Sequence, residues 1–391
     1  MAKLRIMTVF GTRPEAVKMA PVIKELERRS GEIVPLVAVT AQHREMLDQV
    51  LELFEITPNY DLNIMQANQT LHDITSRALL GLRDVISEAK PDMILVHGDT
   101  TTTFVAALAG FYAQVPVGHV EAGLRTQNKY SPFPEEMNRK LTGAIADLHF
   151  SPTETSKANL LAEGVKLENI FVTGNTVIDA LLATVRDNYT FADPVLNQLD
   201  FANRKVILVT THRRENLGEP MRNIYLALQQ LIEENPDVEI IFPMHKNPHV
   251  REVVNSVLGQ TERVHLIEPL DYQPFVNLMA RSHIILTDSG GVQEEAPSFG
   301  KPVLVLRDTT ERPEAVEAGT VLLIGTDRNE VYRTASTLLK DPAAYSKMAN
   351  AINPYGDGLA AARIVDSILY SFKNSKNRPK DFKANISENL L

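Results

Sequence analysis

Short apolar runs alternate with amphipathic runs along almost the whole chain. An apolar run bounded by turn residues is typical of a buried strand, and apolar positions three and four residues apart are typical of a helix. The first series opens with an expected strand at 4–10 and a helix at 14–29. A second series opens with a strand at 205–211. Regular alternation of this kind predicts βαβ units and parallel sheets, which is the α/β fold class.

The expected elements fall into these two series. Strands are expected at 4–10, 33–40, 93–97, 115–120, 148–151 and 170–172, and then at 205–211, 238–243, 264–267, 283–287, 302–306 and 320–323. Helices are expected at 14–29, 43–54, 71–89, 101–113 and 135–146, and then at 221–234, 248–258, 274–280, 292–298, 330–339, 343–348 and 358–372.

The two series predict two Rossmann-like, doubly wound domains that face a shared cleft. We assign residues 1–186 to the first domain and 187–357 to the second, with the helix 358–372 completing the first. The polar stretch 187–204 is interpreted as a linker, and 373–391 as a mobile tail. Ligands of such sheets bind beyond the carboxyl ends of the strands. Residues that directly follow strands are therefore the first candidates for a site.

Composition narrows the class of protein. With 391 residues, 44% hydrophobic and 23% charged, the chain has the balance of a soluble protein of two ordinary domains. It contains no apolar run of membrane-spanning length, and its first residues predict a strand rather than a signal peptide. The absence of cysteine excludes disulfides, thiolate catalysis and Cys-ligated zinc, and suits a cytoplasmic protein. A net charge of −9 argues against nonspecific nucleic-acid binding.

In the first series, charged residues follow three strands and one Pro-rich loop. Arg13 and Lys18 stand at the start of a helix, where positive charge opposes the macrodipole, and this favours anion binding over a solvated surface. Asp99 follows the strand 93–97, where it could also be a helix N-cap. Glu121 follows the strand 115–120, and Glu135 follows a Pro-rich loop. Carboxylates that converge on one place separate their pKa values and supply acid and base, although each alone could be structural.

In the second series, His212 follows the strand 205–211 beside two arginines, and His245 follows the strand 238–243 beside a lysine. The strand 283–287 ends in Ser289-Gly290-Gly291, a turn whose free N–H groups could hold a phosphate, with Glu294 or Glu295 near enough to meet a ribose. A plain turn is the alternative. Phe275 could contact a base or lie in the core.

Several common motifs are absent from the sequence. No GxGxxG follows a strand, so dinucleotide binding has no support, and no GxxxxGK[ST], HExxH, EF-hand loop or GxSxG occurs. Neither a metal nor a cofactor is expected.

A set of co-ordered motifs closely resembles the bacterial non-hydrolysing UDP-N-acetylglucosamine 2-epimerases. The motifs include GTRPEAVKMAP, HGDTTTT, VEAGLRT, SPFPEEMNR, THRRENLG and DSGGVQEEAPSFGKPVLVLRDTTERPEA, and the likeness spans about residues 3–372. The resemblance implies two domains of the GT-B type with the active site between them, a cytoplasmic homodimer, and reversible conversion of UDP-GlcNAc to UDP-ManNAc. It also implies that UDP is eliminated to leave 2-acetamidoglucal and is then added back.

By residue, the resemblance implies acid and base roles for Asp99, Glu121 and Glu135, and a role for His212 in the departure of UDP. Implied binding residues are Arg13, Lys18, His245, Leu270, Phe275, Ser289, Gly290, Gly291, Glu295 and Arg312. Some relatives carry Gln at the position of Leu270, so a contact there would use its backbone. Relatives can bind a second UDP-GlcNAc as an activator, and Gln42 and His43 lie in the matching stretch.

Three alternatives remain open at this point. A hydrolysing relative would release ManNAc and UDP, a GT-B glycosyltransferase would need an acceptor, and a UDP-sugar sensor would bind without exchange at C2. Neither the order of the acid and base nor the need for an activator can be read from the sequence.

Overall fold

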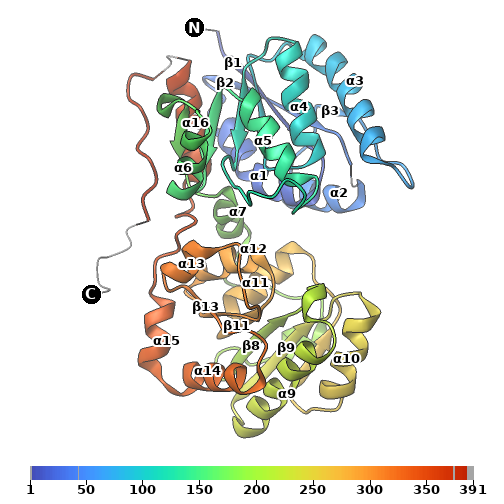
Figure 1. The fold of residues 1–391 in the computed structure, drawn as a ribbon, viewed down its shortest axis with the longest axis vertical. Coiled ribbons are helices and arrows are strands. Elements are labelled where there is room, and N and C mark those ends of the chain that lie inside the picture. Colours follow the sequence, from blue (N-terminus) through green and yellow to red (C-terminus); the bar gives the residue numbers. More distant parts are fainter. Residues whose placement is uncertain (1, 43, 373–374, 385–391) are drawn as a thin grey trace. The chain divides into compact units, whose positions relative to one another are not determined.

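The computed structural model describes residues 2–42, 44–372 and 375–384 of the chain. Its contacts divide it into two compact units (Figure 1). Met1–Ala183 and Tyr355–Lys383 form the first unit, and Thr184–Pro354 lies in the second. The chain therefore leaves the first unit after Ala183 and returns to it at Tyr355.

A seven-stranded parallel sheet forms the centre of the first unit, in the order β3-β2-β1-β4-β5-β6-β7. Its strands are β1 (Leu4–Phe10), β2 (Ile33–Val39), β3 (Tyr60–Asp61), β4 (Met93–His97), β5 (Val117–Val120), β6 (Leu148–Ser151) and β7 (Ile170–Val172). Its helices are α1 (Arg13–Arg28), α2 (Arg44–Leu53), α3 (Leu71–Ala89), α4 (Thr101–Tyr112), α5 (Glu135–Ile145), α6 (Glu154–Ala162), α7 (Thr176–Thr184) and α16 (Ala360–Ser371), with a 3₁₀ turn at Leu167–Asn169.

A six-stranded parallel sheet forms the centre of the second unit, in the order β10-β9-β8-β11-β12-β13. Its strands are β8 (Lys205–Thr210), β9 (Val238–Pro243), β10 (Val264–Ile267), β11 (Ile284–Thr287), β12 (Val303–Val305) and β13 (Val321–Leu323). Its helices are α8 (Pro194–Gln198), α9 (Glu219–Glu234), α10 (Pro248–Leu258), α11 (Tyr272–Arg281), α12 (Gly290–Glu295), α13 (Pro313–Glu317), α14 (Arg328–Lys340) and α15 (Pro342–Ala349), with 3₁₀ turns at Arg214–Asn216 and Ala296–Phe299.

The strands are apolar on both faces, so each sheet needs helices on both sides to bury them. In the first unit α3, α4 and α5 pack in a row, while α1 packs against α2 and α16. In the second unit α9 lies between α10 and α14. The apolar stripes of α3 and α4 meet β1, β2 and β4 in one core, and those of α9, α10 and α14 meet the strands of the second sheet in another. Burial of these stripes is the main force that fixes each layer.

The expected α/β fold of two doubly wound parallel sheets is confirmed, and all twelve expected strands occur, with some ends shifted by a few residues. The sequence reading missed β3, α6, α7, α8 and α13. Helix α7 is apolar almost all round, and α6 buries only Ser156 and Leu160, so neither shows the alternation that marks an amphipathic helix.

The stretch 187–204 is not the plain linker that its polarity suggested. It contains α8, whose N-cap Asp193 accepts a hydrogen bond from the amide of Val195. Phe191 is buried, and the guanidinium of Arg281 lies 5.2 Å from the centre of its ring. This stretch therefore packs as part of the second unit.

The sequence also suggested a mobile tail over 373–391, of which 373–374 and 385–391 lie outside the described residues. Within the described stretch 375–384, Arg378, Asp381 and Phe382 contact β7, the edge strand of the first sheet. Phe382 is buried and donates its amide N–H to the carbonyl of Val172, 2.7 Å away, and Asp381 accepts from the amide of Val172 at 3.2 Å. Arg378 lies over the ring of Phe171. These contacts connect the stretch to the first sheet, whereas its polar sequence had predicted a mobile tail.

Within the parts of the chain that the structure describes, no helix has both the length and the apolar character to cross a bilayer.

Candidate functional site

Each sheet has one point where the strand order reverses, and polar residues gather just beyond it. In the first sheet this point lies between β1 and β4, and in the second between β8 and β11. Such a switch point opens a crevice at the carboxyl ends of the strands. The loops there carry Thr12 and Asp99 in the first unit, and His212 and Asp288 in the second.

Glu15 closes the turn after β1. Its carboxylate is buried and accepts hydrogen bonds from the amide and hydroxyl of Thr12, and from the hydroxyls of Thr100 and Thr103. Burial raises the pKa of Glu15. Thr12 and Glu15 also form a capping box at the start of α1, where Arg13 is half-buried. The network thereby ties the loop after β1 to the loop after β4.

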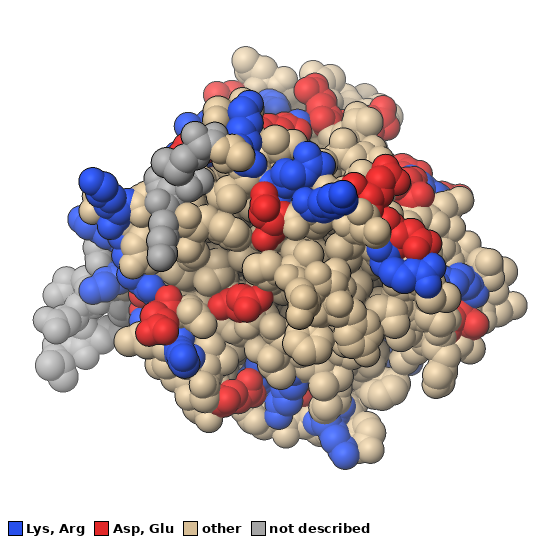
Figure 2. Space-filling view, turned by 90° about the horizontal axis from the view of Figure 1, so that it is seen from above, with Lys and Arg blue, Asp and Glu red and all other residues tan. Residues whose placement is uncertain are grey.

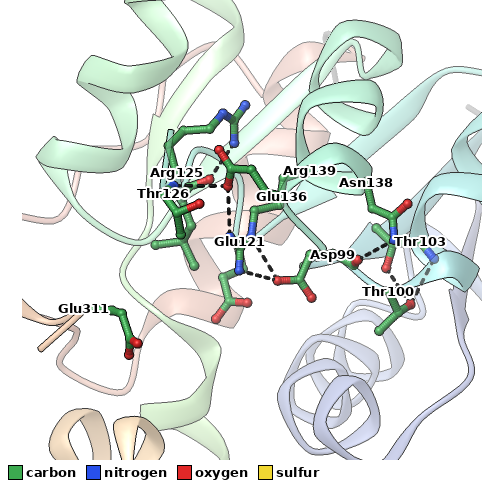
Figure 3. Close-up of polar contacts among 12 residues, drawn as sticks. Asp99, Thr100, Thr103, Glu121, Arg125, Thr126, Glu136, Asn138, Arg139 and Glu311 are labelled. Atoms are coloured by element: carbon green, nitrogen blue, oxygen red, sulfur yellow. Dashed lines mark hydrogen bonds and ion pairs between the residues drawn. The ribbon is translucent and has the colours of Figure 1, made fainter. Parts of the chain in front are cut away.

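Arg139 lies between two carboxylates, as Figure 3 shows. Its Nη2 lies 2.6 Å from Asp99 Oδ2, and its Nη1 lies 3.1 Å from Glu136 Oε2. Glu136 is fully buried and also accepts from the amides of Thr126 and Gln127. The N-cap of α4 is Thr100, so Asp99 does not have the capping role that was its structural alternative. Arg139 thus orients Asp99 from a neighbouring helix.

Glu121 follows β5 directly, and its backbone has φ 62°, a left-handed conformation that is uncommon for a residue with a side chain. Lys18 forms an ion pair with its Oε1, which also accepts from the side-chain amide of Asn175 at 3.1 Å. Its Oε2 lies 3.7 Å from Nε2 of His97. Gly123 then fixes the loop close to α6, since a Cβ there would lie 2.2 Å from the carbonyl oxygen of Ser156.

His97 is buried, and among the described residues neither of its ring nitrogens has a hydrogen-bond partner. Burial lowers its pKa to about 4, so at neutral pH the ring beside Glu121 carries no charge. His119 and His149 follow on β5 and β6, also buried, and burial lowers their pKa values to about 3 and about 4. The first sheet therefore carries three neutral histidines on adjacent strands.

Glu135 is the first residue of α5 and is half-buried. Its carboxylate makes no hydrogen bond or ion pair with another residue of the described chain. The loop before it contains two cis peptide bonds, preceding Pro132 and Pro134. Of the three expected carboxylates, Asp99 and Glu121 have cationic partners, and Glu135 has none among the described residues.

His212 lies against a buried aspartate in the second unit. Its Nδ1 is 2.8 Å from Oδ1 of Asp288, a residue with no exposed surface. Oδ2 of Asp288 accepts from the amides of His212 and Arg213, each at 2.9 Å. Burial alone would raise the pKa of Asp288, but the hydrogen bonds from the His212 ring and the two amides outweigh it and hold the pKa below its usual value.

The Ser-Gly-Gly turn lies beside two guanidinium groups. Ser289 is the N-cap of α12, and a Cβ on Gly290 would lie 3.9 Å from Nη2 of both Arg213 and Arg312. Arg312 also forms an ion pair with Glu294, which is buried. Gly291 is exposed, and a Cβ there would lie 3.9 Å from Oε1 of Glu295. Backbone, two cations and a carboxylate therefore meet at one end of β11.

The remaining expected binding residues of the second unit follow β9 and β10, the strands next to β8 in the sheet, or lie in α11. The ring of His245, after β9, stacks beside that of His212 with 5.9 Å between the centres. Leu270 follows β10, and Phe275 lies in the first turn of α11; both are half-buried.

Gln42, in the loop after β2, accepts a hydrogen bond from the hydroxyl of Thr102 at 3.2 Å, and its carbonyl accepts from Gln69. His43 lies outside the described residues. The structure thus connects Gln42 to the start of α4 and leaves His43 as an expectation from the sequence.

Neither the distribution of surface charge nor the grouping of acidic side chains indicates a binding site for a polyanion or for a metal ion. Lysine and arginine alternate with aspartate and glutamate across the face drawn in Figure 2, without an extended basic patch there. Across the described ranges, no group of three His, Asp or Glu side chains is placed to hold a metal ion.

Sequence reasoning missed Glu15, Glu136, Arg139 and Asp288. Glu15 had a local signal, the Thr-x-x-Glu capping box, and Asp288 stands directly after a buried strand and before Ser-Gly-Gly. The contact of Arg139 with Glu136 is a local i,i+3 pair within α5, but its contact with Asp99, 40 residues away in the chain, had no such signal because only the tertiary fold joins them.

Comparison with known proteins identifies the family. The model of the UDP-N-acetylglucosamine 2-epimerase family matches residues 24–369. The UDP-N-acetylglucosamine 2-epimerase of Bacillus subtilis is 60% identical over 382 residues, covering 98% of this chain and 99% of that protein. The crystal structure of UDP-GlcNAc 2-epimerase from Neisseria meningitidis bound to UDP-GlcNAc has 55% identity and a TM-score of 0.82, covering 94% of this chain and all of that one.

A more distant structure has the same architecture. The UDP-GlcNAc 2-epimerase of Methanocaldococcus jannaschii, in complex with UDP-GlcNAc and UDP, is 34% identical with a TM-score of 0.71, and the match covers 94% of this chain and all of that one. These matches extend over both units and over the loops that carry the carboxylates and the Ser-Gly-Gly turn. The chain therefore belongs to the UDP-N-acetylglucosamine 2-epimerase family.

Proposed function

We propose that the protein is an isomerase that interconverts UDP-GlcNAc and UDP-ManNAc by inverting C2 of the sugar, without net hydrolysis. The observation that carries this proposal is the arrangement in the first unit. Asp99 and Glu121 follow neighbouring strands, and each is oriented by a cation, Arg139 or Lys18. Two oriented carboxylates beside a crevice are suited to moving a proton to and from carbon.

The C2 proton is not adjacent to a carbonyl, so direct deprotonation would form an unstabilised carbanion. Elimination of UDP across C1–C2 avoids this. A carboxylate of the first unit takes the C2 proton while the C1–O bond breaks, which gives 2-acetamidoglucal and UDP. Return of a proton to the opposite face of C2, with re-addition of UDP to C1, completes the inversion. Nothing is oxidised, so the reaction requires no redox cofactor.

The second unit has the groups needed to hold UDP while it is detached. Arg213 and Arg312 lie around Gly290, and His212 lies beside them on its aspartate. We propose that Ser289, Gly290 and Gly291 hold the diphosphate with Arg312, and that Glu295 contacts the ribose. His212 would stabilise the charge that develops on the leaving phosphate. His245, Leu270 and Phe275 complete the proposed site for UDP, and Arg13 contacts the substrate from the first unit.

The proposal is tested by NMR of UDP-GlcNAc with the protein in D₂O. We expect UDP-ManNAc to form from UDP-GlcNAc and the reverse, with deuterium entering at C2. Free ManNAc with UDP as the main products would instead identify a hydrolysing enzyme. Binding without deuterium exchange would identify a sensor, and sugar transfer only in the presence of an acceptor would identify a GT-B glycosyltransferase.

We further propose that the protein forms a homodimer through the outer surface of α3 and α4. Leu80, Phe111 and Tyr112 are more than half exposed there, beside a hollow of about 750 Å³ lined by apolar parts of both helices. A two-fold contact places this surface against its own copy. Analytical ultracentrifugation should show a dimer that Leu80→Arg converts to monomer; a monomeric wild-type protein would contradict the proposal.

Gln42 and His43 are proposed contacts of a second UDP-GlcNAc that activates the enzyme. Epimerisation of UDP-ManNAc alone should then accelerate when a small amount of UDP-GlcNAc is added. Linear progress curves from UDP-ManNAc alone, unaffected by UDP-GlcNAc, would contradict an activating site.

A further inference from the structure

Asp288 makes more directed contacts than a simple counter-ion requires. Its Oδ2 accepts three hydrogen bonds, from the amides of His212 and Arg213 at 2.9 Å and from the side chain of Asn216 at 3.2 Å. Because backbone amides cannot act as acceptors, Oδ2 must be an acceptor in every state of the folded loop. The plane of the carboxylate is thereby fixed, and Oδ1 is directed at one ring nitrogen of His212.

The contact at Oδ1 selects one form of the imidazole. Nδ1 of His212 lies 2.8 Å from Oδ1, which can only accept while Asp288 is ionised. The hydrogen bonds that lower the pKa of Asp288 favour that ionised state at neutral pH. Nδ1 must therefore carry the proton, and Nε2 is the nitrogen left for a ligand.

We propose that Asp288 is a positioning residue for His212: it holds the imidazole with Nδ1–H toward itself and Nε2 toward the phosphate of UDP. This inference rests on the proposed role of His212 in UDP departure. When Nε2 also carries a proton, the ring becomes a cation, and the buried carboxylate behind it stabilises that charge. Arg213 donates to the backbone carbonyl of Asp288, and the ring of His245 stacks beside that of His212 with 5.9 Å between the centres, so both basic side chains lie beside this ring.

The fixed acceptors make the substitution Asp288→Asn informative. In the variant, the amide oxygen should occupy the position of Oδ2, because three donors point there, whereas Oδ1 is approached by one amide, that of His212, at the longer distance of 3.1 Å. The amide NH₂ group then faces Nδ1 of His212, which becomes an acceptor and forces the ring proton onto Nε2. The variant keeps the shape and most hydrogen bonds of the loop and reverses the tautomer.

The first measurement does not depend on activity. Proteins labelled with ¹⁵N-histidine are compared by NMR with UDP bound, and the His212 signals are assigned from the spectrum of His212→Gln. We expect a protonated Nδ1 in the wild type and an unprotonated Nδ1 in Asp288→Asn. Identical His212 signals in the two proteins would overturn the inference even if the protein proves not to be an epimerase.

The second measurement concerns turnover. Asp288→Asn should lower kcat by on the order of 10²-fold, the scale of one lost donor to a developing oxyanion. On a His212→Gln background, where no imidazole remains to orient, the same substitution should change kcat by less than about threefold. Equal losses on both backgrounds would mean that Asp288 acts only through loop structure and would overturn its positioning role.

Asp308→Asn is the matched control, since it makes the same chemical change after the neighbouring strand β12 at an exposed position. It should leave both the His212 signals and kcat unchanged. An effect of Asp308→Asn as large as that of Asp288→Asn would show that loss of a negative charge alone explains the result, and would also contradict the inference.

Discussion

In the first unit the carboxylates at the ends of the strands are paired with long cationic side chains, whereas in the second unit the buried Asp288 is held by backbone amides. Lys18 and Arg139 reach Glu121 and Asp99 through flexible stems. The amides of His212 and Arg213 have no such freedom. A carboxylate held by side chains can change partners during a proton transfer, while one held by the main chain serves as a fixed support.

The comparison also concerns the cations that each unit can offer to an anionic ligand. In the second unit the cations Arg213 and Arg312 approach Gly290 and leave room for an anion. In the first unit Lys18 and Arg139 are paired with carboxylates, as Arg312 is with Glu294 in the second, whereas Arg213 forms no ion pair with another described residue. The first unit is therefore suited to act on a neutral sugar and the second to hold the diphosphate, in agreement with the proposed division of labour.

The largest effect is expected when the charge of Glu121 is removed, which tests whether the carboxylates of the first unit carry out the chemistry. Glu121→Gln removes a proton acceptor and keeps the side-chain shape, so kcat should fall by about 10²–10⁴-fold, as should that of Asp99→Asn. Binding of UDP alone, measured by calorimetry, should change by less than about threefold. Glu27→Gln, an exposed change on α1, is the control. Near-normal turnover in both variants would remove the carboxylates from the chemistry.

Removing Arg139 tests whether the cations of the first unit are structural partners. Arg139→Met leaves Glu136 fully buried without its cation, so the free energy of unfolding should fall by about 3 kcal/mol. Urea unfolding measures this change. Arg333→Met, which removes an exposed ion pair with Glu330 in the second unit, should cost less than about 1 kcal/mol. Equal losses would mean that the pairing at Arg139 contributes no more than a surface contact.

The neutral histidines of the first unit predict a response to acid. An unfolded imidazole gains a proton below its ordinary pKa of about 6.5, whereas folded His149 stays neutral to about pH 4. Acidification through this window therefore favours unfolding. His149 should account for about 2 kcal/mol of the stability lost between pH 7 and pH 5. His149→Leu should lose correspondingly less stability over that range, measured by urea unfolding at both pH values. An identical pH dependence in the two proteins would show that His149 takes up its proton over the same pH range in the folded and unfolded states.

The smallest expected effect is on UDP affinity in the second unit. Arg312→Gln removes one cation near Gly290, and the dissociation constant of UDP should rise about 10-fold. Arg333→Gln removes an arginine that is paired with exposed Glu330 instead, and it should leave UDP binding unchanged. Calorimetry measures both. A larger effect of Arg333→Gln would place the anion site elsewhere in the unit.

The alternation of apolar and amphipathic runs was sufficient to predict the parallel sheets, because a strand buried on both faces must be apolar throughout. The alternation did not reveal α7, which is apolar almost all round, or α8, which is short and lies in a polar stretch that was interpreted as a linker. Only the part of the candidate site that directly follows strands in the chain could be predicted from the sequence. Residues that follow strands, such as Asp99 and His212, could be found, whereas the partner Arg139 depends on helix packing that no local pattern encodes.

The stretch along β7 has a practical consequence for work with this protein. An unprotected outer strand offers its free N–H and C=O groups to other molecules and promotes aggregation. Here Asp381 and Phe382 occupy those groups on Val172. A version of the protein cut after α16 would lose that cover, so an affinity tag is better attached beyond residue 384 than in place of the final residues.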